Sequence, residues 1–148
     1  MRKMLAVVLS VLLLTGFSLP CFAEGVPSQR VVSTSTRQTE DGFTIVTTIE
    51  AGLLNARSVR GGSITEQYYY DGQEIGTMIL MGTFYYDGST ARATGASKSY
   101  STASGWSYSG GDAKTSGASV SVSGSFDSGS KHCAVDMTLT CSPGGELS

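Results

Sequence analysis

The sequence contains few of the residues that carry metal or nucleophile chemistry. Among 148 residues there are one histidine, three cysteines and one tryptophan. Cys21 lies in a leader described below, which leaves His132, Cys133 and Cys141, and a structural zinc site uses four ligands. Neighbouring residues on a strand point to opposite faces, so His132 and Cys133 are not expected to form a Cys–His dyad. We therefore expect no metal site and no cofactor.

Charged residues are also scarce, and acidic ones slightly outnumber basic ones. Only 15% of residues are charged, and the formal net charge is −2. Without Arg2 and Lys3, which lie in the leader, eight basic residues face twelve acidic ones and the net charge is −4. Nucleic acids and anionic membrane surfaces attract clustered positive charge. We therefore expect no nucleic-acid partner.

One uninterrupted apolar run stands at the N-terminus. Arg2 and Lys3 precede residues 4–14, which are almost entirely apolar, and Gly16, Pro20 and a short tail ending at Ala23 follow. A membrane span needs roughly 17 to 25 apolar residues. The pattern instead predicts a secretory signal peptide over residues 1–23, cleaved between Ala23 and Glu24. Residues 24–148 then form one secreted domain without stable membrane insertion.

Cys21 raises the alternative of a lipid anchor. Lipoproteins keep a cysteine at the mature N-terminus after a small residue, whereas Pro20 precedes Cys21 here. The match is poor, so we expect free secretion to the extracellular space and no lipid anchor.

Residues 68–86 form the apolar centre of the chain. Asp71 and Gly72 stand between two apolar runs and predict a tight hairpin, because both central residues of its turn need positive φ. The tetrapeptide Tyr-Tyr-Asp-Gly recurs at residues 85–88, so residues 73–86 predict one long strand. Both of its faces are largely apolar, which favours an inner position in a sheet. Gly76 or Gly82 is expected to bend it.

Period-two patterns predict further strands on both sides. They cover residues 30–37 and 43–50 around an Asp41-Gly42 turn, and residues 119–126 and 131–141, whereas residues 51–62 are expected to form a connection. No helix is expected after the signal peptide. The sequence predicts an all-β fold, a single antiparallel β-sandwich or flattened barrel of eight to ten strands.

Cys133 and Cys141 give conflicting indications. Two cysteines in an oxidising compartment normally form a disulfide. On one straight strand, however, their Cα atoms would lie roughly 26 Å apart at ~3.3 Å per residue, against a limit near ~7 Å for a disulfide. The strand pattern favours thiols that are unbridged or paired between molecules, and we doubt an intramolecular disulfide.

Nothing in the sequence predicts catalysis. The Asp-Gly pairs at Asp41, Asp71 and Asp87 lack the alternate carboxylates of a calcium loop and are better explained as turns. A glycoside hydrolase needs two carboxylates across a cleft. The strand-borne candidates, which the sequence does not pair, are Glu50, Glu66, Glu74 and Asp136. We expect a protein that is not an enzyme, with a hydrolase as the less favoured alternative.

Aromatic residues are numerous for one small core. They are Tyr68, Tyr69, Tyr70, Tyr85, Tyr86, Tyr100, Trp106 and Tyr108. Some could stiffen the sheet as cross-strand pairs. Those left outside would suit an extracellular or cell-envelope binding module that stacks on cell-wall glycan or on another secreted protein. The proposed binding residues are Tyr69, Tyr86, Trp106 and Tyr108. The alternative is a self-assembling structural subunit that forms oligomers through sheet edges.

Several of these segments together resemble a known group. They are the turn at residues 70–72, the run at residues 82–88, the Gly-Trp-Ser at residues 105–107, and the end of the chain at residues 138–141 and 145–148. The chain resembles small secreted all-β proteins of Firmicutes, which are Gram-positive bacteria. The group has no established activity, so the resemblance implies export and a β fold but no mechanism. It also implies a partner cysteine for Cys141 in the strand after the second turn, and residues 90–94 contain none.

Overall fold

The computed structural model describes residues 30–52 and 58–148. The predicted signal peptide, its cleavage between Ala23 and Glu24, and Cys21 lie outside the described residues. Within the described part of the chain, no helix has the length and apolar character needed to cross a membrane.

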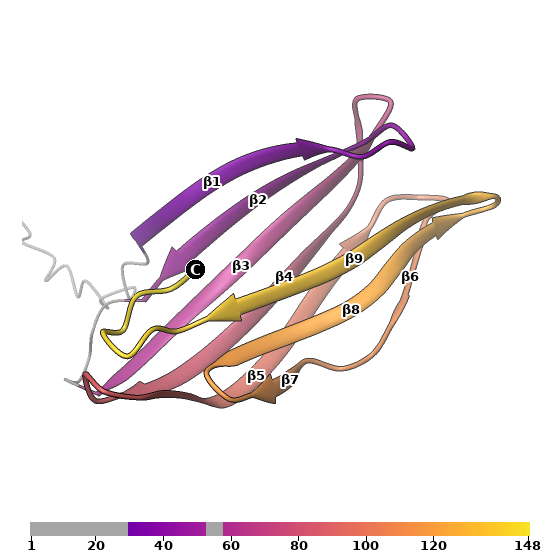
Figure 1. Cartoon of the computed structure of the whole chain (residues 1–148). Helices are drawn as coiled ribbons and strands as arrows, with labels where there is room; N and C mark the ends of the chain where they lie inside the picture. Colours follow the sequence, from indigo (N-terminus) through magenta and orange to yellow (C-terminus); the bar gives the residue numbers. More distant parts are fainter. Residues whose placement is uncertain (1–29, 53–57) are drawn as a thin grey trace, which may run out of the picture.

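Five strands form the first sheet, in chain order and all antiparallel (Figure 1). They are β1 (Arg30–Gln38), β2 (Phe43–Ala51), β3 (Val59–Tyr70), β4 (Gln73–Tyr86) and β5 (Ala91–Thr102). Asp71 and Gly72 have φ values of 51° and 75°, as the tight β3–β4 turn requires. The fourteen-residue β4 lies between β3 and β5, so the predicted long inner strand is confirmed.

A second antiparallel sheet is built around β8 (Ser119–Ser128). β9 (Lys131–Thr140) pairs with one edge of β8, and β6 (Ser107–Gly110) and β7 (Lys114–Ser116) pair with the other. The two sheets face each other (Figure 1) and are not closed into a barrel. The all-β prediction is therefore confirmed for the described chain, whose nine strands lie within the expected number, and the flattened-barrel alternative is wrong.

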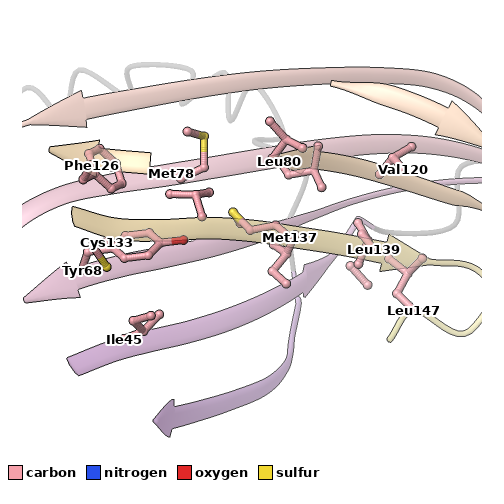
Figure 2. Close-up of a cluster of buried hydrophobic side chains, with 14 of the residues drawn as sticks. Ile45, Tyr68, Met78, Leu80, Val120, Phe126, Cys133, Met137, Leu139 and Leu147 are labelled. Atoms are coloured by element: carbon pink, nitrogen blue, oxygen red, sulfur yellow. The ribbon is translucent and has the colours of Figure 1, made fainter. Parts of the chain in front are cut away.

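The core lies between the sheets, and its buried strand residues come from β2, β3, β4, β8 and β9 (Figure 2). On β8 and β9 the buried sets agree with the period-two prediction; they are Val120, Val122 and Phe126, and Cys133, Val135, Met137 and Leu139. On β4 only one face is covered, because Met78 and Leu80 are buried whereas Met81 is exposed. The apolar character of the other face of β4 therefore does not reflect burial.

A bulge bends β4 beside Gly76, one of the two predicted positions. Tyr68 pairs with Gly76 and Tyr69 with Glu74, so Ile75 is an extra residue, and it is buried. A Cβ at Gly76 would lie 2.6 Å from the Phe126 ring, so the glycine lets this ring pack directly on the backbone.

The start of β3 and the segment after β9 were not predicted from the sequence. Residues 59–62 begin β3 and pair with β4, so the expectation that they belong to a connection is wrong. At the end of β9 the chain folds back: Cys141 forms a bridge with Leu147, and Ser148 N–H donates to the carbonyl of Thr140 at 3.0 Å. Cys133 and Cys141 are both buried and unbridged.

Candidate functional site

Four connections meet at one end of the two sheets, which we call the hairpin end. They are residues 39–42, 71–72, 103–106 and 129–130, which follow β1, β3, β5 and β8 (Figure 1). Antiparallel neighbours reverse direction at each turn, so alternate connections lie at the same end of a sheet. Loops presented by a rigid pair of sheets are a common place for binding residues.

Three aromatic side chains pack together at the hairpin end. The Phe43 and Tyr70 ring centroids are 5.0 Å apart, and the Trp106 ring lies 6.2 Å from Phe43 and 6.3 Å from Tyr70. Phe43 is buried, whereas Tyr70 and Trp106 are half-buried. The Lys131 ammonium lies 4.1 Å from the Tyr70 ring centroid, a cation–π distance. Trp106 and Tyr70 thus keep aromatic surface at the rim of the core.

Three hollows run side by side across this end and form what we call the hairpin groove. The first, of about 260 Å³, lies between Tyr70 and Trp106 and includes Lys131. The second, of about 360 Å³, shares Tyr70 and Lys131 with the first, and includes Phe43 and His132. The third, of about 170 Å³, shares Phe43 and His132 with the second. The shared lining residues place the three hollows next to one another along this end.

The rim of the hairpin groove carries charge of both signs. Its side chains include the carboxylates of Asp41, Asp71 and Glu74, the amide of Gln73, and the cations of Lys131 and Arg37. Aromatic surface beside a few fixed polar groups is the usual composition of a small-ligand site. The groove is therefore suited to stacking and hydrogen bonding rather than to attracting one sign of charge.

A polar cluster adjoins the groove at His132. His132 Nδ1 lies 2.6 Å from Asp127 Oδ1, and the Ser125 hydroxyl donates to Asp127 Oδ2 at 2.7 Å. These hydrogen bonds, from Ser125 first and then from His132, hold the pKa of Asp127 below its usual range. In a Ser-His-Asp triad the imidazole stands between serine and carboxylate, whereas here the carboxylate is central. The cluster therefore does not activate a serine.

Sequence reasoning did not identify Asp127 as the partner of His132. The two face each other across the β8–β9 hairpin, whose turn is Gly129 and Ser130, with Gly129 at a φ of 58°. Gly129 between the two alternating segments could have indicated this pair, because a two-residue turn fixes which residues of the two strands lie opposite each other.

A buried carboxylate lies between the sheets behind the groove. Glu66 is 5% exposed; it accepts hydrogen bonds from the hydroxyls of Tyr68 and, at 3.1 Å, Thr47. Arg37 Nη2 lies 3.9 Å from Glu66 Oε1. Burial, and then the bond to Glu66, raise the pKa of Tyr68 well above its ordinary value. Neighbouring side chains thus satisfy this carboxylate.

The two thiols are chemically quiet. Burial raises the pKa of Cys133 to about 11, and burial also raises the pKa of Cys141. The thiolate is the reactive form of cysteine, so both side chains remain protonated at neutral pH. An intermolecular disulfide would first require either thiol to become exposed.

The four residues predicted to bind lie in different places. Trp106 is in the hairpin groove with Tyr70. Tyr108 stacks against the exposed Tyr100, with ring centroids 4.5 Å apart, away from the groove. Tyr69 is half-buried on β3, and Tyr86 is 8% exposed at the opposite end of β4. The structure therefore brings Trp106 together with a tyrosine of the Asp71-Gly72 turn, and not with the other three.

The predicted carboxylates are also dispersed. Glu66 is interior, Glu74 lies in the hairpin groove, and Asp136 is exposed on β9, while Glu50 is half-buried on β2. Across residues 30–52 and 58–148, no three His, Cys, Asp or Glu side chains are grouped so that they could hold a metal ion.

Comparison of the chain with protein-family models, with curated proteins and with solved structures finds no match.

Proposed function

We propose that the protein is an extracellular, non-enzymatic binding module whose hairpin groove holds a glycan of the cell envelope. The observation that carries this proposal is the half-exposed pair of Trp106 and Tyr70 inside a groove rimmed by carboxylate, amide and ammonium groups. The proposal includes export by the N-terminal signal peptide and a sandwich arrangement of the two sheets in the secreted domain.

The chemistry of the groove favours a sugar over other ligands. A sugar ring offers apolar C–H faces that pack on aromatic rings, and hydroxyls that bond to carboxylates and amides. Asp71, Gln73 and Glu74 supply such acceptors and donors beside Trp106. The mixed charge of the rim and the acidic balance of the chain do not favour a polyanion.

Retention on isolated cell-wall glycan tests the proposal. Trp106→Ala removes the half-exposed ring, and we expect binding to fall by about tenfold or more, because an aromatic contact is worth roughly 0.5–1.5 kcal/mol beyond the area that it buries. Tyr100→Ala is the matched control, since Tyr100 is an exposed aromatic outside the groove. Equal losses in both variants, or full retention of a folded Trp106→Ala protein, would refute the proposal. Binding only to a secreted protein would replace the glycan by a protein partner.

One observation supports self-assembly as a second candidate function. β1 is an edge of the first sheet and is exposed along all nine residues, with no charge between Arg30 and Arg37. Such an edge can pair with another strand, although the bulge at Val32 shortens the regular part. Light scattering across a concentration series should show growth that Thr34→Pro abolishes. A constant monomer mass would exclude this candidate.

A further inference from the structure

The first sheet is wider than the second, and one side of the molecule is therefore left open. Five strands lie side by side in the first sheet, whereas the second is three strands wide because β6 and β7 share one edge of β8. β9 is the other edge and packs on β3 and β4, so β2 and β1 extend beyond it (Figure 1). We call the space between β1 and β9 the open side.

Hollows lie at both ends of the open side. The third hollow of the hairpin groove is lined by Arg37 of β1 and by His132 and Ala134 of β9. At the opposite end, a hollow of about 470 Å³ is lined by the start of β1 and by the segment after β9. Every residue of β1 is exposed. The open side therefore extends along the full length of β1.

The backbone of β9 has unpaired hydrogen-bonding groups along the open side. Cys141 N–H donates to the Ala118 carbonyl at 3.0 Å, toward β8, whereas Thr140 exchanges hydrogen bonds with Ser148 on the other side. Successive residues of a strand direct their N–H and C=O groups to opposite edges. The backbone groups of residues 132, 134, 136 and 138 therefore point away from β8, and the described chain offers them no backbone partner.

The outer edge of β1 has the same property. Thr39 N–H donates to the Phe43 carbonyl at 2.8 Å, toward β2. Alternation then directs the backbone groups of Thr34, Thr36 and Gln38 away from β2. The side chains of these three residues lie on the face of the sheet that points away from the core. Natural edge strands are usually protected by charged residues, and β1 has none between its two arginines.

A two-fold axis between the layers, parallel to the strands, brings the two kinds of edge together. It places β1 of a second copy beside β9 and opposite β2, where the overhang of each copy fills that of the other. β1 runs toward the hairpin end and β9 runs away from it, and this rotation keeps strand direction, so the new pairs are antiparallel. On β9, as on β1, the residues with unpaired backbone groups have outward side chains. Hydrogen bonding and inward burial are therefore compatible.

The register of the new pairs follows from the register inside one copy, because the rotation preserves position along the strands. Arg37 is level with Tyr68 through their common partner Ile45. The Tyr68 ring lies 4.9 Å from that of Phe126, and Phe126 pairs with Cys133. Arg37 of one copy is thus level with Cys133 of the other.

This register pairs compatible side chains. The pairs between the copies are Gln38 with His132, Thr36 with Ala134, and Thr34 with Asp136. None of them joins like charges, and each can exchange two backbone hydrogen bonds. Where the end of β1 meets the hairpin groove, each copy contributes one charge of each sign, Arg37 and Asp41.

We propose that the protein forms a closed two-fold dimer through the open side, in which β1 of each copy pairs with β9 of the other. The proposal rests on the β1 edge considered above for self-assembly, gives that edge a defined partner, and ends assembly at two chains. It does not depend on the glycan proposal, because the dimer fills the third hollow and leaves the first, with Trp106 and Tyr70, open.

Disulfide cross-linking tests the strand pairing. Thr36→Cys combined with Ala134→Cys should give a covalent dimer on oxidation, because residues that exchange hydrogen bonds have Cα atoms about 5.5 Å apart, within disulfide range. The matched control combines Val46→Cys with Ala134→Cys. Val46 is opposite Thr36 but one strand further from the edge, roughly 10 Å from Ala134 of the second copy. This control and each single variant should remain uncross-linked.

Sedimentation across a concentration series tests the assembly state. The mass should rise from one chain to two and no further. Ala134→Pro removes an N–H that points away from β8, so the β8–β9 ladder is retained. Because the symmetry repeats the loss, Ala134→Pro should weaken the dimer by about tenfold or more. A melting curve checks that the variant folds, and cross-linking decides the matter if it does not.

Three results would overturn the proposal. They are a mass of one chain at every concentration, growth beyond two chains, and a protein that dimerises but cross-links equally, or not at all, in the test pair and in the Val46→Cys control. Retention on cell-wall glycan is measured separately, so failure of the dimer and failure of the glycan site can be told apart.

Discussion

Replacing Tyr68 by Phe removes the hydroxyl that binds the buried carboxylate of Glu66. Tyr68 is 0% exposed, so no water can replace this donor without disturbing the core. A hydrogen bond to a charged group contributes about 1.5–3 kcal/mol. The Arg37 side chain is mainly exposed and adds little. We therefore expect Tyr68→Phe to lower the free energy of unfolding by about 1.5–3 kcal/mol.

Glu66→Gln separates the effect of the charge from that of the bond. An amide oxygen still accepts from Tyr68, but a neutral pair contributes only about 0.5–1.5 kcal/mol. Tyr68→Phe made in the Glu66→Gln background should thus cost less than in the unaltered protein, and the difference is the coupling between the two groups.

Urea unfolding measures these changes, with stability taken from the transition midpoint at constant slope. Tyr100→Phe is the control, because Tyr100 is 52% exposed, and a surface change of this kind stays within about 0.5 kcal/mol. A Tyr68→Phe effect as small as that of the control would refute the reasoning. An equal effect of Tyr68→Phe in the unaltered protein and in the Glu66→Gln background would also refute it.

Four further predictions concern the labelling of Cys133, a close backbone contact at Gly124, and the dependence of stability on pH in alkali and in acid. The pKa of Cys133 is raised from 9.0 to about 11, so its thiolate fraction at pH 8 should be about a hundredfold below that of an ordinary cysteine. A thiol reagent should therefore label Cys133 only after unfolding. The same shift stabilises the fold fully below pH 9, and this contribution should be lost as pH rises from 9 to 11 in urea unfolding experiments. Gly124→Ala would place a Cβ 2.5 Å from the Ser109 carbonyl oxygen, and a melting curve should show destabilisation by about 1–3 kcal/mol. The hydrogen bonds that lower the pKa of Asp127 stabilise the fold above pH 3.8, the ordinary pKa of this side chain, and this stabilisation is lost as pH falls. Asp127→Asn should therefore flatten the acid limb of a plot of melting temperature against pH.

Local patterns predicted most of the strands because each pattern reflects burial of one face. The alternation in residues 119–126 and 131–141 corresponds to β8 and β9, whose apolar faces close the core. The start of β3 was missed because Gly61 and Gly62 are typical of a turn. Gly62 is required instead by Leu147, which approaches it from the far end of the chain. No local rule contains that contact.

The candidate site was only partly predictable for the same reason. Regular alternation through the Asp71-Gly72 turn would place Tyr69 and Tyr86 on the same face, and only the bulge at Ile75 puts them on opposite faces. Alternation also does not show which face the second sheet covers. The structure buries Tyr86 and leaves Tyr69 half-buried. The partnership of Trp106 with Tyr70 joins a loop before β6 to the end of β3, and it depends on how the two sheets pack.

Tryptophan fluorescence offers the most direct test of the hairpin groove as a glycan site. Trp106 is the only tryptophan in the sequence, so its emission reports on the groove alone. Titration with soluble cell-wall glycan fragments should give a saturable change in emission, which Tyr70→Ala weakens and Tyr100→Ala leaves intact. Glycan binding that calorimetry detects while Trp106 emission stays constant, or the absence of any binding, would contradict the proposed function.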